Sequence, residues 1–486
     1  MKPWQIWIDT GGTFTDCIAH TPGGDIKRLK VLSSGALKGL VVGQLSSQQL
    51  KVQLQWPVSR DIFENFVMTF FDTKKTSSRI GKASLKESVI HLKTSLRGRI
   101  KPGTTFEISS SEEVPVFAAR LLTETRFKDT FPKIELKLGS TRGTNALLER
   151  KGAPTALIIT KGFRDLLVIG TQQRPDLFAL NIVRPQPLYD FVIEVEERIE
   201  ASGKVFKSLT QSALLKILKE IQKTDCASVA IALLNSYENP IHEKLVKERL
   251  IDQGYRFVTA SHEISGQIKI LPRAETTVAN AYLDPIIRTY VANIQSGLLG
   301  AKLKLMTSAG GLVNAANFFP KDSLLSGPAG GVTGAVTSAQ LSGVNKIVTL
   351  DMGGTSTDVS LYNNQYSYRY ESKVGDIKIL SPSLTIETIA AGGGSICDFD
   401  GYKLIVGPHS AGASPGPACY GSGGPLTITD VNLLLGRADA DFFSIPLYKD
   451  KSEAALDLLI EKIEASTGKK PRKEILLQSF IQIANE

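Results

Sequence analysis

Two short stretches of the sequence share a pattern of acidic, glycine and threonine residues that suits phosphate chemistry. Residues 9–16 read Asp-Thr-Gly-Gly-Thr-Phe-Thr-Asp, and residues 351–358 read Asp-Met-Gly-Gly-Thr-Ser-Thr-Asp. Glycines in such a turn keep side chains out of the way, so that backbone N–H groups and Thr hydroxyls can point at one anionic group. Asp9 and Asp351 would repel a phosphate directly, but each suits a hard cation such as Mg2+, which in turn neutralises phosphates.

The pattern predicts a role for the residues of both loops. Asp9 and Asp351 are the candidate metal ligands, and one of Asp16 or Asp358 orients a nucleophile or braces its loop. We count these aspartates as the catalytic candidates, because phosphoryl transfer depends on positioning and charge neutralisation rather than on a strong base. The candidate phosphate contacts are Gly11, Gly12, Thr13, Thr15, Gly353, Gly354, Thr355 and Thr357.

Each loop follows a strand-like apolar run, at residues 4–8 in the first copy and at residues 347–350 in the second. Two such units far apart in the chain predict two related lobes that close on one nucleotide. The competing interpretation is that each loop is an ordinary glycine-rich hairpin turn. A single copy would leave the two interpretations evenly matched, but two copies with matching Asp and Thr positions favour the nucleotide site.

The two loops resemble the phosphate-1 and phosphate-2 loops of the actin, sugar kinase and Hsp70 ATPase superfamily. The motifs around them resemble the hydantoinase A and 5-oxoprolinase family over nearly the whole chain, most weakly between about residues 45 and 137. The resemblance implies an α/β fold with actin-like (ribonuclease H-like) ATPase lobes, duplicated phosphate loops and an inserted subdomain. Besides the loops, it is carried by residues 140–145, 174–178, 325–331, 407–413 and 415–420.

Members of this family use ATP to activate an amide or lactam carbonyl, so the resemblance implies ATP and Mg2+ as cofactors and a small cyclic amide as substrate. The γ-phosphoryl group would pass to the amide oxygen of 5-oxoproline or a hydantoin-like ring, and water would then attack the activated carbon. A hydantoinase B-like subunit or fused domain would assist, and we expect an oligomer. The resemblance also assigns nucleotide or hinge contacts to Gly392, Gly393 and Gly394.

Two further segments supply candidate substrate contacts. Arg142 could grip a carboxylate or phosphate in two places, and Thr144 and Asn145 stand at the start of a helical stretch, where anions and carbonyls bind. The alternative for this segment is simple helix capping. His262 follows a predicted strand, where α/β folds bind ligands, although a structural histidine is the competing interpretation.

The order of apolar runs and turns predicts two regions. Residues 1–200 form an amino-terminal hydantoinase/oxoprolinase lobe, which includes an inserted β-rich subdomain at about residues 45–137, with candidate strands at 89–92 and 105–108. Residues 201–486 form a hydantoinase A-type α/β region with a parallel sheet. We expect this region to be truncated, because relatives continue into a glycine-rich adenosine-contacting segment. Expected strands are 156–160, 228–234 and 256–260, and expected helices are 209–222, 241–253, 276–296, 332–341 and one with an apolar face at Ile475, Leu476, Phe480 and Ile483.

Composition excludes several classes of protein. The 486 residues are 42% hydrophobic and 22% charged, which is typical of a soluble globular chain with two or three domains. The net charge is +9, but Lys and Arg are spread along the chain without a nucleic-acid motif, so we expect no nucleic-acid partner. The four cysteines lack CxxC spacing, and no signal peptide or membrane span is visible. We therefore expect a cytoplasmic protein with reduced thiols.

Three other functions are open at this point. The chain could be the ATP-using subunit of a ketone carboxylase of the acetone or acetophenone type, which shares these loops. It could also be a non-catalytic, nucleotide-gated module of actin or Hsp70 type, or a nucleotide-free protein in which both turns are structural relics. ATP turnover that depends on a lactam would indicate the amide hydrolase, and turnover that depends on a ketone plus bicarbonate would indicate the carboxylase. A non-catalytic module would be stimulated by neither.

Overall fold

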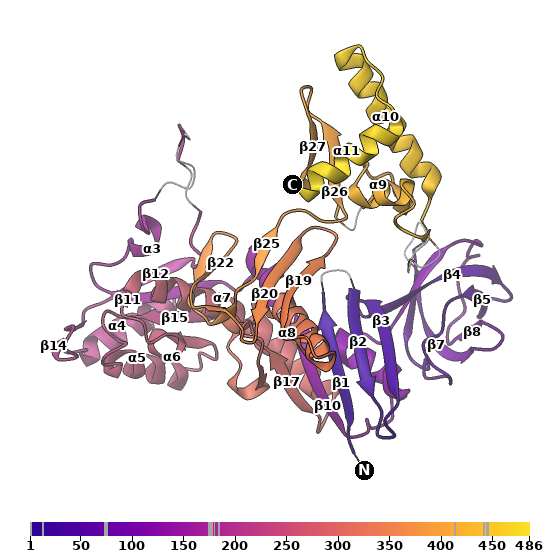
Figure 1. Cartoon of the computed structure of the whole chain (residues 1–486). Coiled ribbons are helices and arrows are strands. Elements are labelled where there is room, and N and C mark those ends of the chain that lie inside the picture. Colours follow the sequence, from indigo (N-terminus) through magenta and orange to yellow (C-terminus); the bar gives the residue numbers. More distant parts are fainter. Residues whose placement is uncertain are drawn as a thin grey trace. The chain divides into compact units, whose positions relative to one another are not determined.

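A computed structural model describes residues 2–11, 14–71, 76–173, 178, 180–182, 185–412, 415–440, 443 and 447–486 (Figure 1). Contacts divide the chain into two compact units. Unit 1 comprises Met1–Gly330 and Tyr368–Leu384, and unit 2 comprises Gly331–Ser367 and Thr385–Glu486. Residues 9–16, the first of the two matched loops, therefore belong to unit 1, and residues 351–358, the second, belong to unit 2.

Unit 1 is built on a sheet in which the first loop joins two central strands. Strand β1 pairs with β2 in antiparallel fashion and with β10 in parallel, and β17 runs parallel to β10. Alternate residues of β2 are buried, which matches its alternating sequence. The strands of this part are β1 (Trp4–Thr10), β2 (Phe14–His20), β3 (Ile26–Leu32), β10 (Ile134–Ser140), β17 (Lys302–Met306) and β18 (Leu312–Asn314).

Six further strands continue the same sheet from β3 and close on themselves. Their order is β4-β5-β8-β7-β6-β9, and β9 pairs back to β4, so every strand has two neighbours. Phe70, Phe106 and Met68 fill the interior of this closed part with no exposed surface. The expected strands at 89–92 and 105–108 are confirmed. The bounds are β4 (Ala36–Gln44), β5 (Gln49–Gln53), β6 (Val67–Phe70), β7 (Ser77–Ser84), β8 (Val89–Leu92) and β9 (Thr105–Ser109), and helix α1 (Val114–Thr123) follows.

A separate four-stranded parallel sheet has the order β12-β11-β15-β16. Strands β11 and β15 are buried along their whole length, and accordingly read as continuous apolar runs. The expected parallel sheet is confirmed, and it contains strands from both sides of residue 200. The elements are α2 (Arg142–Leu148), β11 (Thr155–Thr160), α3 (Leu166–Ile169), β12 (Phe191–Val195), α4 (Gln211–Ile221), β15 (Ser228–Ala232), α5 (Ile241–Asp252), β16 (Val258–Ala260), α6 (Ser261–Ile264) and α7 (Ile270–Gly297).

Helix α7 corrects one expectation. It begins at Ile270 rather than at residue 276, so Arg273 and Glu275 lie inside the helix and do not precede it. The short elements of unit 1 are β13 (Arg198–Ile199), β14 (Val205–Lys207), η1 (Ala315–Asn317), η2 (Pro320–Ser323), β21 (Tyr368–Arg369), β22 (Ser372–Val374), β23 (Ile377–Ile379) and β24 (Ser383–Leu384).

Unit 2 carries the second loop between β19 and β20 of a three-stranded antiparallel sheet, β19-β20-β25. A hairpin, β26 with β27, and three helices form its separate apolar core. In helix α11 the buried residues are Leu476, Leu477 and Phe480. The sequence had assigned Ile475 to the apolar face, which was wrong, because Ile475 is 59% exposed. The elements are β19 (Lys346–Met352), β20 (Thr357–Asn363), β25 (Glu387–Ile389), β26 (Ser395–Phe399), β27 (Leu404–Ser410), η3 (Ala418–Tyr420), α9 (Ile428–Leu434), α10 (Lys449–Thr467) and α11 (Lys473–Asn485).

Helix α8 (Ser326–Leu341) passes from unit 1 into unit 2. The sequence predicted that this helix begins at residue 332, after a cluster of small residues. That prediction was wrong, because the Ser-Gly-Pro-Ala-Gly-Gly segment is itself helical. Pro328 lies in the first turn, where a helix tolerates proline because the missing N–H would have no partner within the helix.

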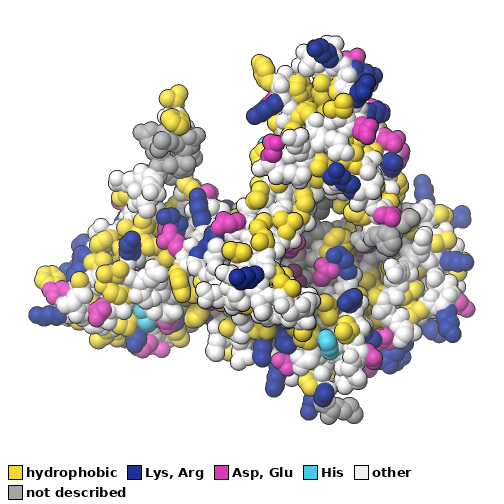
Figure 2. Space-filling view, viewed as in Figure 1, with side chains coloured by type: hydrophobic (Ala, Val, Ile, Leu, Met, Phe, Trp, Pro, Cys, Tyr) yellow, Lys and Arg dark blue, Asp and Glu magenta, His cyan; other side chains and the backbone are white. Residues whose placement is uncertain are grey.

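Surface charge follows the expectation from the sequence. Figure 2 shows Lys and Arg side chains scattered over the visible surface among acidic ones, without a single basic patch. Within the described residues, none of the helices combines the length and apolar character that crossing a membrane would need. All four cysteines are free thiols, and three of them, Cys17, Cys397 and Cys419, are buried.

Candidate functional site: two matched loops

The first loop is a tight turn between β1 and β2. The N–H of Gly11 donates to the carbonyl of Phe14 at 3.0 Å, and Asp9 lies opposite Asp16 in the ladder. A Cβ added to Gly11 would lie 2.9 Å from the Phe14 oxygen, so this position requires glycine. Gly12 and Thr13 lie outside the described residues, and their predicted phosphate contacts stay predictions.

The second loop repeats this geometry in unit 2. The N–H of Gly353 donates to the carbonyl of Ser356 at 2.9 Å, and Asp351 lies opposite Asp358. Gly354 and Thr355 follow at the exposed tip of the turn. The hairpin-turn interpretation and the phosphate-loop interpretation therefore describe the same local shape, and the shape is duplicated.

The second aspartate of each loop is held by the third strand of its sheet. Asp16 lies opposite Lys30 of β3 and accepts from its ammonium group at 3.0 Å. Asp358 lies opposite Thr388 of β25 and accepts from its hydroxyl at 2.6 Å. Both carboxylates thus tie a loop to a neighbouring strand, which favours bracing over the orientation of a nucleophile.

The threonine before each of these aspartates points inward. The Thr15 hydroxyl lies 3.0 Å from that of Ser33, which in turn donates to the Gly11 carbonyl at 2.8 Å. The Thr357 hydroxyl donates to the carbonyl of Ala391 at 2.5 Å. These contacts support the loops from inside, and direct phosphate binding by either hydroxyl stays a prediction.

Gly392, Gly393 and Gly394 pack against the backbone of the second loop. The N–H groups of Gly393 and Gly394 donate to the carbonyls of Gly353 and Gly354 at 3.0 and 2.6 Å. A Cβ added to Gly392 would lie 2.8 Å from three backbone atoms of residues 353–355. The segment therefore holds the loop in place, and its predicted nucleotide contacts stay predictions.

The first aspartate of each loop is exposed, as a metal ligand must be before the metal binds. Beside Asp9, strand β10 presents Gly139, and a Cβ there would approach the Asp9 carboxylate to 3.0 Å. Within the parts that the structure describes, no three His, Cys, Asp or Glu side chains gather into a ready metal site. That donor set still fits Mg2+, which keeps several waters and binds through one or two carboxylates plus substrate phosphates.

The Thr-Arg-Gly-Thr-Asn segment lies beside the first loop. Both the N–H and the hydroxyl of Thr141 donate to the Thr10 carbonyl at the end of β1, at 3.0 and 3.2 Å. The Thr144 hydroxyl donates to the Leu324 carbonyl at 2.5 Å, and the Asn145 amide donates to Thr141 at 3.4 Å. Neither side chain caps helix α2, so the capping alternative fails, and Thr144 is directed inward.

Arg142 is the exposed member of this segment. Its guanidinium lies 2.9 Å from the Glu113 carboxylate and 4.5 Å from the ring centre of Tyr290. Asn293 donates to the other Glu113 oxygen at 3.0 Å. A charge held on two sides in this way has a fixed position and still offers donors to a ligand.

Glu113, Tyr290 and Gly139 were not predicted as site residues, because they come from distant segments and carry no local motif. Burial raises the pKa of Tyr290 to about 12, so this phenol stays neutral and can donate a hydrogen bond. Hydrogen bonds of Tyr290 with the side chains of Thr10 and Ser140 oppose that rise.

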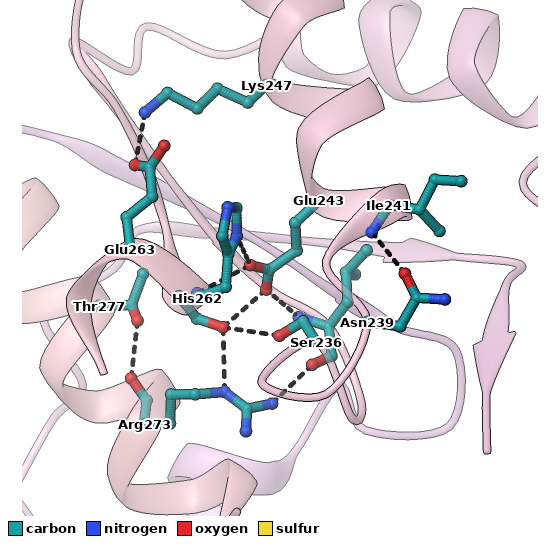
Figure 3. A network of polar contacts seen from close by, with 11 residues as sticks. Ser236, Asn239, Ile241, Glu243, Lys247, His262, Glu263, Arg273 and Thr277 are labelled. Carbon is teal, nitrogen blue, oxygen red and sulfur yellow. Dashed lines mark hydrogen bonds and ion pairs between the residues drawn. The ribbon is translucent and has the colours of Figure 1, made fainter. Parts of the chain in front are cut away.

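His262 lies at a different sheet. The ring Nδ1 of His262 is 2.7 Å from a Glu243 carboxylate oxygen, and the backbone N–H of His262 donates to the same oxygen at 3.0 Å (Figure 3). Glu243 is fully buried and also accepts from the Ser261 hydroxyl at 2.6 Å. These contacts favour the structural interpretation of His262, whose substrate role stays a prediction.

Arg273 completes this buried network below Glu243 (Figure 3). It has no exposed surface and donates to the Ser261 hydroxyl at 3.0 Å and to the Leu233 carbonyl at 2.7 Å. Burial lowers the pKa of Arg273, and the charge of Glu243 opposes that effect. The pair thus fixes the carboxyl ends of β15 and β16 to helices α5 and α7.

The Arg-Pro-Asp-Leu motif at residues 174–177, which also carried the resemblance, lies outside the described residues.

Two family models match the chain. One, described as the hydantoinase/oxoprolinase N-terminal region, matches residues 109–254. The other, described as hydantoinase/oxoprolinase, matches residues 273–486. The two matches lie in chain order and include the second loop.

Two similar proteins have names that describe an activity. The 5-oxoprolinase of Saccharomyces cerevisiae is 40% identical over 392 residues, which cover 72% of this chain and 30% of the yeast protein. Caprolactamase subunit alpha of Pseudomonas jessenii is 33% identical over 349 residues, which cover 68% of this chain and 49% of that subunit. The chain thus spans about 30% of the yeast 5-oxoprolinase and about half of the caprolactamase subunit.

Two solved structures are similar over 99% of this chain and 61% of theirs. The ATP-dependent caprolactamase of Pseudomonas jessenii has a TM-score of 0.68 at 26% identity. A nucleotide-free acetone carboxylase has a TM-score of 0.64 at 21% identity, a likeness that concerns the fold alone. The mixed α/β fold expected from the sequence is confirmed.

Proposed function

The chain belongs to the hydantoinase/oxoprolinase family, and on that premise we propose that it is the ATP-using portion of an ATP-dependent cyclic amide hydrolase. The proposed substrate class is 5-oxoproline or a hydantoin-like ring. We propose that the two units are lobes of the actin-like type and that the protein works in the cytoplasm. The names of the 5-oxoprolinase and caprolactamase relatives support the reaction class.

One observation carries the proposal: two loops with the same Asp-x-Gly-Gly-Thr pattern have the same turn hydrogen bond and the same Asp–Asp register. Two turns with a purely structural role would not need the same sequence pattern. A phosphate group, in contrast, needs small residues and free N–H groups at each contact. Gly11 and Gly353 supply that space. We propose that both loops bind the phosphates of ATP.

Asp9 and Asp351 would hold Mg2+, directly or through its waters. Bound there, the ion supplies neutralisation of the phosphate charge. The chain's own residues do the rest: the loop N–H groups orient phosphate oxygens, while Asp16 and Asp358 keep both turns rigid through Lys30 and Thr388. Positioning of this kind is the main contribution a protein makes to phosphoryl transfer.

The substrate would lie against the segment beside the first loop. Arg142, fixed by Glu113 and Tyr290, can bind a carboxylate such as that of 5-oxoproline. Transfer of the γ-phosphoryl group to the ring amide oxygen leaves ADP and makes the carbonyl carbon open to water. Water then adds to that carbon and the C–N bond breaks, which leaves an acyl phosphate, and a second water releases phosphate from it to give the carboxylate. We propose a hydantoinase B-like subunit or domain for this second half and an oligomeric assembly, which the subunit name of the caprolactamase relative supports.

The test is MgATP binding by the chain, followed by ADP release in the presence of a hydantoinase B-like partner. We expect 5-oxoproline to raise ADP release at least tenfold, and Asp9→Ala and Asp351→Ala each to abolish the increase. Asp25→Ala is the matched control, because Asp25 is an exposed carboxylate in the turn after β2. Stimulation by a ketone plus bicarbonate instead would identify a ketone carboxylase, and ATP binding with no stimulation would identify a nucleotide-gated module. An intact chain that does not bind MgATP would overturn the proposal.

A further inference from the structure

A lysine lies beside the two aspartates of the first loop. Asp9, Asp16 and Lys30 occupy opposite positions on β1, β2 and β3, so their side chains share one face of the sheet. The Lys30 ammonium group lies 3.0 and 3.1 Å from the two carboxylate oxygens of Asp16 and 5.2 Å from the ring centre of Phe14. Two carboxylates that face each other across a ladder repel. Lys30 offsets that repulsion at the first loop.

Lys137 adds a second positive charge to this face. It lies opposite Trp7 of β1, and its ammonium group is 4.3 Å from the centre of the Trp7 ring. Trp7 and Asp9 are two positions apart on β1, so Lys137 and Asp9 share a face. Glu135, on the same face, is paired with Lys304 at 3.4 Å. The Asp9 carboxylate therefore has positive charge on the β10 side as well as on the β3 side.

No cation completes the corresponding row at the second loop. Asp351 and Asp358 lie opposite each other on β19 and β20, and β25 places Thr388 opposite Asp358. The Thr388 hydroxyl donates to Asp358 at 2.6 Å and carries no charge. Among the residues of these three strands, the single Lys or Arg is Lys346. Lys346 is an odd number of positions from Asp351 on β19, so it points to the opposite face.

Helix α8 adds no charge beside Asp351. A Cβ added to Gly331 would lie 3.7 Å from an Asp351 carboxylate oxygen, so a small residue of the helix adjoins this carboxylate. The helix contains no Asp, Glu, Lys or Arg between Ser326 and Leu341. Neither the three strands nor this helix therefore places a positive charge on the Asp351 side of the sheet. Two facing carboxylates in such a setting suit a divalent ion with its own waters.

We propose that Asp351 is the principal Mg2+ ligand of this chain, and that Lys30 takes the place of the ion at the first loop and lowers the affinity of Asp9 for it. The inference rests on the proposed function, in which Asp9 and Asp351 hold the Mg2+ of MgATP. The shared motif makes the two aspartates equivalent, whereas their neighbours make them unequal. A positive charge about 7 Å from a divalent ion weakens its binding by about fivefold to tenfold, even when water screens the pair.

The test exchanges the third residue of each row and measures metal affinity. Turnover does not separate the two aspartates, because the proposed function requires both. Mn2+ replaces Mg2+ as the probe, and its affinity for the chain is titrated by water-proton relaxation, with and without ADP. We expect Asp351→Asn to weaken Mn2+ binding at least tenfold and Asp9→Asn by less than about threefold. Thr388→Lys should weaken binding about fivefold or more, and Lys30→Thr should strengthen it about threefold or more.

Two substitutions that change the charge elsewhere are the matched controls. Ile389→Lys adds a lysine on the same strand as Thr388, but on its opposite face, where Ile389 is 56% exposed. Lys38→Thr removes an exposed lysine of β4 that lies opposite Glu107, away from the first loop. We expect each control to change Mn2+ affinity by less than about twofold, because water and salt screen distant charges.

The outcomes separate this inference from the proposed function. Equal losses in Asp9→Asn and Asp351→Asn, with no effect of either exchange, would overturn the inference and leave the proposed function standing. A loss that Ile389→Lys shares with Thr388→Lys would also overturn it, because net charge alone would then set the affinity. An unchanged chain that binds no Mn2+ with or without ADP would overturn the proposed function itself. Thermal melting of each variant checks that it folds.

Discussion

The two matched loops, at residues 9–16 and 351–358, have the same local geometry but different surroundings. In both, a glycine N–H closes the turn and two aspartates face each other across the ladder. The first loop lies in a sheet that is paired on both sides and covered by α1, whereas the second lies at the edge of a three-stranded sheet with an exposed apolar face. The local sequence therefore determines the geometry of the turn, and segments distant in the sequence determine what packs around it.

The support of the two loops also differs in kind. Ser33 supports the turn of the first loop from within its own meander, through a side-chain hydrogen bond to the Gly11 carbonyl, while the distant Thr141 contacts only the start of that loop, at the Thr10 carbonyl. The second loop rests on the backbone of residues 392–394, which come from beyond the end of its sheet. The turn of the second loop should therefore be more sensitive than that of the first to changes outside its own motif. The following predictions test the comparison of the two loops.

The largest effect is expected for Gly392→Ala. Its Cβ would lie 2.8 Å from the Gly353 oxygen, the Gly354 carbon and the Thr355 nitrogen, and backbone atoms cannot move aside as a flexible side chain does. We expect the free energy of unfolding of unit 2 to fall by about 3 kcal/mol and MgATP affinity to fall with it. Thermal melting and calorimetric titration measure the two effects.

Gly334→Ala is the control for this change. A Cβ at Gly334, inside helix α8, has no neighbouring atom within 4 Å. Alanine there should stabilise the helix by up to about 1 kcal/mol. If Gly392→Ala melts and binds like the unchanged chain, the glycine segment does not support the second loop.

A smaller, pH-dependent effect is expected for Cys17→Val, which gives the first copy the residue that the second has at Val359. Burial, reinforced by the charges of Asp16 and Asp9, raises the pKa of Cys17 from 9.0 to about 12. Between these pH values the unfolded chain loses the thiol proton and the folded chain keeps it, so stability falls as pH rises. The expected loss is about 1.4 kcal/mol per pH unit.

The measurement is denaturant unfolding of both proteins from pH 7 to pH 10.5. The value at pH 7 gives the packing effect of the substitution, and the slope above pH 9 gives the effect of the thiol. The slope should be shallower in the variant. Parallel curves would mean that Cys17 ionises equally in both states.

The smallest effect is expected for Asp16→Asn and Asp358→Asn. Asp16 and Lys30 are an exposed pair, with side chains 62% and 47% exposed, and such pairs contribute less than about 1 kcal/mol. Asp358 accepts one hydroxyl hydrogen bond, of similar worth. We expect ADP release within about twofold of the unchanged protein in both variants. A loss of about 100-fold in either would identify a catalytic aspartate instead of a brace.

Much of the local structure could be predicted from sequence. The strands around both loops, the four-stranded parallel sheet and helix α4, capped by Thr210, follow from apolar periodicity and from a capping residue. The start of α8 could not be predicted, because its glycines and proline are typical of loops. Its helical state depends on tertiary contacts, such as that of the Ser326 hydroxyl with the Ser140 carbonyl at 3.2 Å.

The candidate site could be predicted only as a pair of loops. Which hydroxyls point outward depends on partners distant in sequence: Thr144 is turned inward by Leu324, and Thr357 by Ala391. The support of Arg142 by Glu113 and Tyr290 joins three segments that share no motif. Such contacts arise only when the sheets are assembled, so a single sequence gives no sign of them.

The closed six-stranded sheet has a consequence for how this protein can change over evolution. Ala36 at its start pairs with Ser109 at its end, so the chain leaves the host sheet and returns to it at one point. A single recombination event at that point could add, exchange or delete the whole element and leave strands β1 to β3 intact. Such a change would leave the first loop as it is, because residues 9–16 precede the element.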